Sequence, residues 1–226
     1  MLYTNIKKAI FLRRPNRFIA YILIDGHEEQ AHVKNTGRCK ELLVEGCTVY
    51  VEEHHNPKRK TKYSLIAVEK GALLINMDSQ APNKVVQEWL LTKEPFGPMS
   101  FLKPECKHGD SRFDFYLEMA EKKMFIEVKG VTLEENGIVR FPDAPTERGV
   151  KHVEELAHCL QEGYEAAIIF VVQMEKAEYF TPNVATHLEF AEALKKADQA
   201  GVKVLAYCCK VTPEELSLGE PLPVRL

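Results

Sequence analysis

Several features that mark other classes of protein are missing from this sequence of 226 residues. No apolar run approaches the length of a membrane span, and the first residues lack the hydrophobic region of a signal peptide, so we expect a cytoplasmic protein with no membrane partner. An excess of positive charge is also missing, because 30 Lys and Arg residues face 33 Asp and Glu residues. Contact with a polyanion would therefore have to come from local basic patches.

Paired cysteines are missing too. The six cysteines include no CxxC pair, and neither they nor the histidines show the spacing of a zinc site. In a reducing compartment we expect the thiols to stay free and to act as small core side chains. The residues concerned are Cys39, Cys47, Cys106, Cys159, Cys208 and Cys209, with His27, His32, His54 and His55.

The first third of the chain is rich in short strand patterns. Asp25-Gly26 lies between two of them and predicts a hairpin, while Thr36 is a candidate cap for a short helix over 36–46. Five strands with a helix between the third and the fourth favour an OB-fold-like β-barrel. We predict these strands at 6–12, 18–24, 31–33, 47–53 and 61–69.

The remainder predicts an α/β (α+β) domain. Helices alternate with strands, and two of the strands are continuous apolar runs, which is typical of a buried sheet. Asn83 and Thr146 are candidate caps of the first two helices. We divide the chain into domains 1–80 and 81–226, with helices predicted at 82–94, 144–163 and 185–201, a hairpin at 112–130, and apolar strands at 166–173 and 202–211.

The hairpin carries charges that a strand seldom holds. If Ala120-Glu121 forms a two-residue turn, Asp114 and Glu127 lie opposite each other, and Lys129 points into the same space. Like charges facing each other are destabilising, and a bound Mg²⁺ or Mn²⁺ would remove that penalty. A cation that activates water beside a lysine suits phosphodiester hydrolysis, whereas the alternative is a solvated sheet face of mixed charge.

Other charged residues extend this hypothesis. Glu88, on the helix before the hairpin, is a candidate third metal ligand, although many surface helices carry such a residue. The helix after the hairpin carries Arg148, Lys151 and His152 near its start, where a phosphate would explain them, or they form an ordinary polar face.

Two basic patches on the barrel indicate nucleic-acid binding, with solvated loops as the alternative. Tyr21, Tyr50 and Tyr63 are candidate stacking residues, and the stretch at Asn35 and Thr36 weakly suggests phosphate contact. The patches comprise Arg13, Arg14 and Arg17 in one and Lys58, Arg59, Lys60 and Lys62 in the other, with Lys7 and Lys8 nearby.

Five motifs together resemble the sugar fermentation stimulation protein A (SfsA) family. They are "AHVKNTGRCKELL", "SRFDFYLE", "FIEVKGVTL", "FPDAPTERGVKHVEEL" and "GVKVLAYCCKV". The resemblance implies an N-terminal OB domain and a C-terminal domain similar to PD-(D/E)xK nucleases. It also implies DNA binding and a link to the regulation of sugar (maltose) metabolism genes.

The nuclease signature is an acidic residue followed, after a gap, by (D/E)xK. Asp114 matches the acid and Glu127-Val128-Lys129 matches the second part, although the preceding proline is replaced in "RFD". The resemblance therefore implies that Asp114, Glu127 and the Val128 carbonyl hold Mg²⁺ or Mn²⁺ and that Lys129 positions the nucleophile. DNA, single- or double-stranded, is the expected partner and RNA the less favoured one.

Two other interpretations of the sequence stay open. One is a DNA-binding regulator that keeps the nuclease fold without catalysis, and the other is a binder of small ligands in the barrel mouth.

Overall fold

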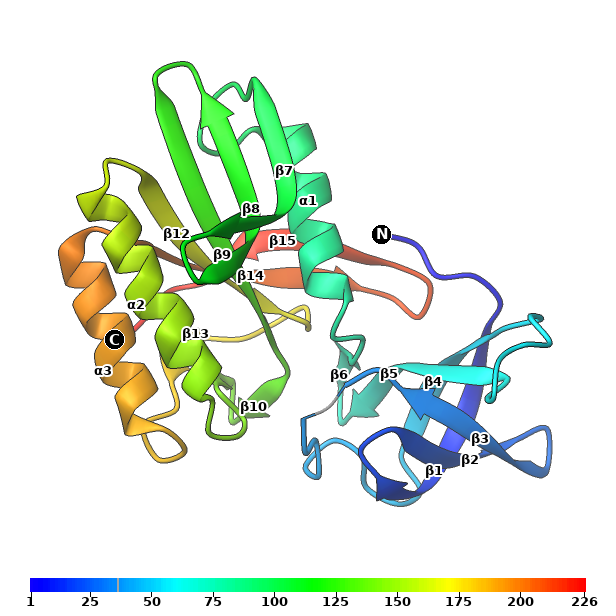
Figure 1. Ribbon diagram of the computed structural model, residues 1–226. Coiled ribbons are helices and arrows are strands. Elements are labelled where there is room, and N and C mark those ends of the chain that lie inside the picture. The colour runs from blue at the N-terminus through cyan, green and yellow to red at the C-terminus, as the bar shows by residue number, and fades with distance from the viewer. Residues whose placement is uncertain (36) are drawn as a thin grey trace.

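The computed structural model describes residues 1–35 and 37–226, which form a barrel followed by a mixed α/β domain (Figure 1). The barrel sheet has the order β3-β2-β1-β4-β5-β6, and a parallel pairing of β3 with β5 closes five of these strands. This confirms the OB-type barrel. Its strands are β1 (Ile6–Asn16), β2 (Ile19–Ile24), β3 (His27–Val33), β4 (Thr48–Glu53), β5 (Tyr63–Lys70) and β6 (Leu73–Asn76).

Alternating apolar residues build the inside of the barrel. Ala20 and Ile22 on β2 and Val49 and Val51 on β4 are fully buried, as the period of two in these strands requires. The predicted turn at Asp25-Gly26 is present, and both residues have positive φ. Such a backbone suits a two-residue hairpin because its twist matches that of the flanking strands.

The short helix predicted over 36–46 is wrong. Residues 37–46 form turns, and Thr36, its proposed cap, lies outside the described residues. A residue far earlier in the chain prevents the helix. The Arg14 guanidinium donates hydrogen bonds to the carbonyl oxygens of Asn35, Gly37 and Arg38, at 2.7, 3.1 and 3.0 Å. These carbonyl groups point at Arg14 and so cannot begin a helical hydrogen-bond ladder.

The second domain contains a six-stranded sheet in the order β15-β14-β12-β9-β8-β7 and a small sheet β10-β11-β13. β9, β12 and β14 run parallel, and the outer strands pair antiparallel. The strands are β7 (Phe101–His108), β8 (Ser111–Met119), β9 (Lys122–Val131), β10 (Leu133–Glu135), β11 (Ile138–Phe141), β12 (Glu165–Val172), β13 (Tyr179–Pro182), β14 (Lys203–Val211) and β15 (Leu216–Pro221).

Helices cover both faces of this large sheet (Figure 1). α1 (Ala81–Lys93) packs its Val85, Val86 and Leu90 on one face, against a core that includes Ile126. α2 (Glu147–Gln161) and α3 (Leu188–Ala200) pack on the other face, in the core that contains Phe170. The site residues of β8 and β9 therefore lie between α1 and α2.

The helix ends were predicted with mixed success. Thr146 caps α2, because its Oγ1 accepts a hydrogen bond from the Gly149 N–H at 3.0 Å. Asn83 does not cap α1, which begins earlier, at Ala81, with Gln80 as its N-cap and Pro82 in the first turn. A proline suits that position because the first N–H groups of a helix have no partner within it. Asn83 is thereby placed inside the helix.

Several strands had no prediction, among them β7, β13 and β15. β7 and β15 lie at the two edges of the large sheet, and β13 pairs with β11. β7 contains Pro104 and is mostly exposed, so its sequence lacks the apolar alternation that reveals a strand. Edge strands often have this composition because only one of their sides needs a partner.

The barrel and the α/β domain share a buried polar network. Gln173, which follows β12, donates through Nε2 to Asn76 Oδ1 at 3.0 Å and to the Asp78 carbonyl at 3.1 Å. Asn76 donates in turn to the Tyr3 hydroxyl at 3.0 Å. Because the first residues of the chain also pair with Glu214 and Glu215, the N-terminal segment runs along the second domain before it enters the barrel. The predicted division between 80 and 81 stays a prediction.

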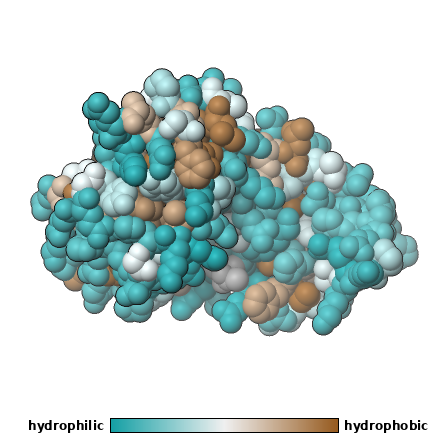
Figure 2. All heavy atoms as spheres, turned by 45° about the horizontal axis from the view of Figure 1, so that its top comes forward, coloured by the Kyte–Doolittle hydropathy of each residue, from teal (hydrophilic) through white to brown (hydrophobic). Residues whose placement is uncertain are grey.

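The surface is mostly hydrophilic on the face shown in Figure 2, with small apolar groups scattered across it. In the parts of the chain before and after Thr36, no helix is long and apolar enough to cross a membrane.

Candidate active site between two separating strands

The candidate site forms where β8 and β9 separate. The predicted register is confirmed over Phe115–Met119, since Phe115 pairs with Ile126 and Leu117 with Met124. Asp114 lies just beyond this ladder, so the predicted pairing of Asp114 with Glu127 is not part of it. Phe113 packs against Phe125 on the α2 side, whereas Phe115 belongs to the core under α1. Phe113 and Phe115 are two residues apart but face opposite sides of the sheet, which shows that the backbone of β8 rotates at Asp114.

Both carboxylate oxygens of Asp114 accept hydrogen bonds. Oδ2 accepts from the Val128 backbone N–H at 2.7 Å, and Oδ1 accepts from Asn83 Nδ2 of α1 at 2.7 Å. Burial, assisted by the negative charge of Glu127, raises the pKa of Asp114 above its ordinary value despite these bonds. A buried acid with a raised pKa beside a second acid is typical of functional sites.

Glu127 is 2 % exposed and lies on the α2 side of the sheet, where it contacts His152. Burial opposes its ionisation, but hydrogen bonds from His152 and Lys129 outweigh burial and hold the pKa of Glu127 below its ordinary value. Lys129 Nζ and His152 Nδ1 both reach Oε1, at 2.6 and 2.5 Å. Asp114 and Glu127 thus have pKa values shifted in opposite directions.

His152 does not lie on the polar face of α2 that the sequence suggested. It is 5 % exposed and points at Glu127, because the buried face of α2 includes His152, Leu156 and Cys159. Arg148 Nε donates to His152 Nε2 at 3.3 Å, so His152 accepts at Nε2 and donates at Nδ1 to Glu127. Lys151 lies on the exposed side, with Nζ 3.6 Å from Glu155.

The structure does not place Glu88 with these acids. Its carboxylate Oε2 lies 2.6 Å from the N-terminal ammonium of Met1, and its side chain is 55 % exposed. The residue of α1 that reaches Asp114 is Asn83, which the sequence suggested only as a cap. A helix places residues five apart on different sides, so one helix cannot aim both at the same acid.

Glu127 Oε2 fits the requirement of a hard cation. This oxygen is buried and has no hydrogen-bond partner among residues 1–35 and 37–226. Each Asp114 oxygen has one accepted hydrogen bond and a second lone pair to offer. Two carboxylates with spare oxygen lone pairs are the protein ligands that Mg²⁺ prefers, and burying an unpaired carboxylate oxygen is otherwise costly.

The first basic patch serves structural and ionic roles. Arg13 makes two hydrogen bonds to Glu28, at 2.6 and 2.7 Å, and lies over the Tyr21 ring. Arg14 holds the loop described above, whereas Arg17 is exposed over the Phe18 ring. These arginines line an open cleft of about 670 Å³ on the barrel.

The second basic patch borders the other cleft, of about 720 Å³. Lys58 and Lys60 are exposed, Arg59 donates to Ser64 Oγ at 2.8 Å, and Lys62 pairs with Glu53 at 2.7 Å. Tyr63 is 3 % exposed and cannot stack on a base, so that expectation is wrong.

Sequence reasoning missed Arg38 and Lys40, which are exposed and line the cleft with Arg17. The same cleft includes Ala144, just before α2, so it leads from the barrel to the helix that carries His152. Asp143 Oδ2 accepts from the Arg38 N–H at 3.3 Å and holds the two segments together. The repeated basic residues of "GRCK" were the available signal.

Comparisons with known proteins agree along the whole chain. A family model described as "SfsA N-terminal OB domain" matches residues 12–77, and one described as "Sugar fermentation stimulation protein RE domain" matches residues 80–215. Proteins described as "Sugar fermentation stimulation protein homolog" from Clostridium beijerinckii and Ruminiclostridium cellulolyticum are 57 % and 56 % identical, over all of both chains.

A solved structure is similar as well. It is described as Pyrococcus furiosus SfsA in complex with Ca²⁺ and has a TM-score of 0.88 and 29 % identity, covering 100 % of this chain and 98 % of that one.

Proposed function

The chain belongs to the sugar fermentation stimulation protein family, and from this premise we propose that it binds DNA and hydrolyses phosphodiester bonds with Mg²⁺ or Mn²⁺. The observation that carries the proposal is the Oε2 atom of Glu127, which lies beside Asp114 and is buried with no hydrogen-bond partner in the described stretches 1–35 and 37–226. Together with Lys129 they match the acid and (D/E)xK pattern of PD-(D/E)xK nucleases.

The cation would be held by Asp114, Glu127 and the Val128 carbonyl. When bound, it lowers the pKa of a water molecule and stabilises charge on a phosphate. Asn83 and the Val128 N–H orient Asp114, and His152 orients Glu127. The solved relative's description records Ca²⁺, which prefers the same oxygen ligands, and this supports a hard-cation site in the present chain.

Two positively charged side chains, those of Lys129 and Arg148, suit contact with a phosphate group of the DNA. Lys129 Nζ, 17 % exposed on its side chain, lies 2.6 Å from Glu127 Oε1 and can move to a water or to a phosphate oxygen once a metal occupies Glu127. Arg148 is exposed next to His152 and can contact a neighbouring phosphate. Lys151 extends this basic surface.

DNA binding is assigned to the barrel clefts and the start of α2. Exposed Arg17, Arg38 and Lys40 line a path from the barrel to α2, while Lys60 lines the other cleft and exposed Lys58 lies two residues before it. Contacts of this kind go to the phosphate backbone, so we expect weak sequence preference and strong dependence on salt.

A second candidate function is a DNA-binding regulator of sugar metabolism genes that does not cleave. The observation in its favour is that Lys129 and His152 occupy Glu127 Oε1 while both Asp114 oxygens accept hydrogen bonds. Such a closed network can hold the fold together without any metal.

A cleavage assay separates the two functions. Plasmid, single-stranded DNA and RNA are each incubated with the protein and Mg²⁺, Mn²⁺ or EDTA. The nuclease proposal expects metal-dependent cleavage that is lost in Glu127→Ala and Lys129→Ala and kept in Glu121→Gln, a matched control at the exposed tip of the hairpin. Retardation of DNA in a gel without cleavage, under every metal condition, contradicts the nuclease and supports the regulator.

A further inference from the structure

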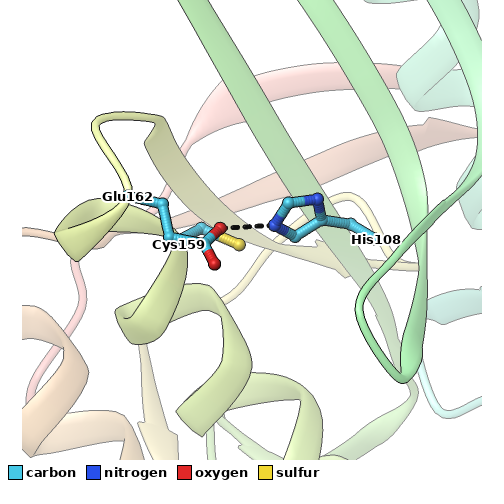
Figure 3. A group of neighbouring side chains, drawn as sticks. All are labelled: His108, Cys159 and Glu162. Atoms are coloured by element: carbon cyan, nitrogen blue, oxygen red, sulfur yellow. Dashed lines mark hydrogen bonds and ion pairs between the residues drawn. The ribbon is translucent and has the colours of Figure 1, made fainter.

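A second cluster of ligand-type side chains lies away from the candidate active site (Figure 3). His108 ends β7, Cys159 lies in the last turn of α2, and Glu162 is the residue that follows this helix. One ligand atom from each lies within 4.8 Å of the other two. Cys159 is seven residues beyond His152, which corresponds to about 10 Å along a helix, so this cluster is separate from Glu127.

We propose that His108, Cys159 and Glu162 bind a Zn²⁺ ion. Thiolate sulfur, imidazole nitrogen and carboxylate oxygen are the three ligand types that zinc takes in proteins, and three protein ligands with one water complete its tetrahedron. Mg²⁺ and Ca²⁺ do not suit this set, because both prefer oxygen ligands.

The surroundings favour a bound ion over a chance grouping. His108 Nε2 already points at Glu162 Oε2, at 2.5 Å, and Cys159 and Glu162 share a helix face because they are three residues apart (Figure 3). A cavity of about 300 Å³ lies beside them, which leaves room for a water ligand. Glu155 also lines this cavity, and its Oε2 is buried without a hydrogen-bond partner among the residues that the structure describes.

Two aromatic side chains hold the ring of His108 in place. It packs against Phe125 at 4.6 Å and Tyr164 at 5.2 Å between ring centroids. Burial raises the pKa of the Cys159 thiol to about 12, so the sulfur is protonated without a metal and zinc must displace that proton. The ligands come from separate segments, which is why their spacing in the sequence shows no zinc pattern.

A zinc ion here would join the β7–β8 turn to the end of α2. β8 carries Asp114 and α2 carries His152, so the ion would fix the spacing of the two elements that build the candidate active site. This proposal does not depend on whether the protein cleaves DNA.

Cobalt titration tests the site in the full-length protein. Metal is first removed by dialysis against a chelator, and Co²⁺ is then added while the thiolate-to-cobalt absorption in the near ultraviolet is recorded. We expect one sulfur-bound Co²⁺ per chain, displaced by Zn²⁺. Cys159→Ser should abolish the band, and His108→Gln should weaken metal binding by at least about tenfold.

Two controls make the outcome specific. Cys47→Ser removes a half-buried thiol of the barrel and should leave the band unchanged, and Glu127→Gln should leave it unchanged because that acid belongs to the other site. Trp89 fluorescence reports whether each variant is folded. A band that is missing in the wild type, or that persists in Cys159→Ser, overturns the proposal.

Discussion

Replacing Gly130 with alanine should destabilise the protein by about 2 kcal/mol. A Cβ atom at this position would lie 2.6 Å from Gln173 Oε1 and 2.8 Å from Pro82 Cγ, which is too close for either contact. Gln173 cannot move away without a loss, because it is 1 % exposed and its Nε2 makes two hydrogen bonds. Pro82 is fixed by its ring at the start of α1.

The magnitude follows from three effects. Forcing a methyl group into a packed interior costs about 1–3 kcal/mol, and losing one hydrogen bond of Gln173 adds about 1 kcal/mol. Alanine restricts the unfolded chain more than glycine does, and this offsets the loss of stability by about 0.4–1 kcal/mol. Because Gly130 does not have a positive φ, the effect is steric, and no backbone strain is added.

Urea denaturation measures the change. Trp89 is the only tryptophan and lies on α1, against Tyr207, so its fluorescence reports on the helix that Gly130 contacts. In a Gln173→Ala background, where one of the two clashing groups is gone, Gly130→Ala should cost less. A Gly130→Ala variant as stable as the wild type, or an equal cost in both backgrounds, would refute the packing argument.

Three further predictions concern the candidate site and the DNA surface. Asn83→Ala removes a hydrogen-bond donor to Asp114, so the pKa of Asp114 should rise further and Mn²⁺ binding, measured by calorimetry, should weaken by about tenfold. Unchanged Mn²⁺ affinity would contradict the role of Asn83. The folded-state pKa of Glu127 is lowered, so its ionisation stabilises the fold above its ordinary pKa and this stability is lost as pH falls through the lowered value. The urea midpoint of Glu127→Gln should therefore depend less on pH below about 5 than that of the wild type, and parallel curves would argue against it. Lys58→Ala and Lys60→Ala should each reduce the salt dependence of DNA binding by about one unit of the logarithmic slope, and unaltered slopes would remove this loop from the interface.

The β8–β9 hairpin could be predicted from the sequence because the residues that determine its faces and its turn are close together in the chain. Alternating apolar residues set the two faces of β9, and a two-residue turn at Ala120 sets the register that pairs Phe115 with Ile126. The barrel followed for the same reason, since β2 and β4 alternate and the turn after β2 contains Asp25-Gly26.

Features that depend on distant contacts could not be predicted. The turns at 37–46 replace a helix because Arg14, far earlier in the chain, takes their carbonyl groups. His152 was grouped with the polar residues at the start of α2, yet it is buried and donates to Glu127. Asn83 reaches Asp114 only because α1 packs closely on Gly130. Spacing along one helix does not contain this information.

The most direct test of the account is a crystal of this protein soaked in Mn²⁺ and measured for anomalous scattering. We predict one peak within about 2.0–2.6 Å of Glu127 Oε2 and of an Asp114 oxygen, a distance typical of divalent cations with oxygen ligands. Lys129 Nζ should then have moved away from Glu127 Oε1. Crystals that show no peak there, with Lys129 still paired to Glu127, would contradict the metal-dependent site.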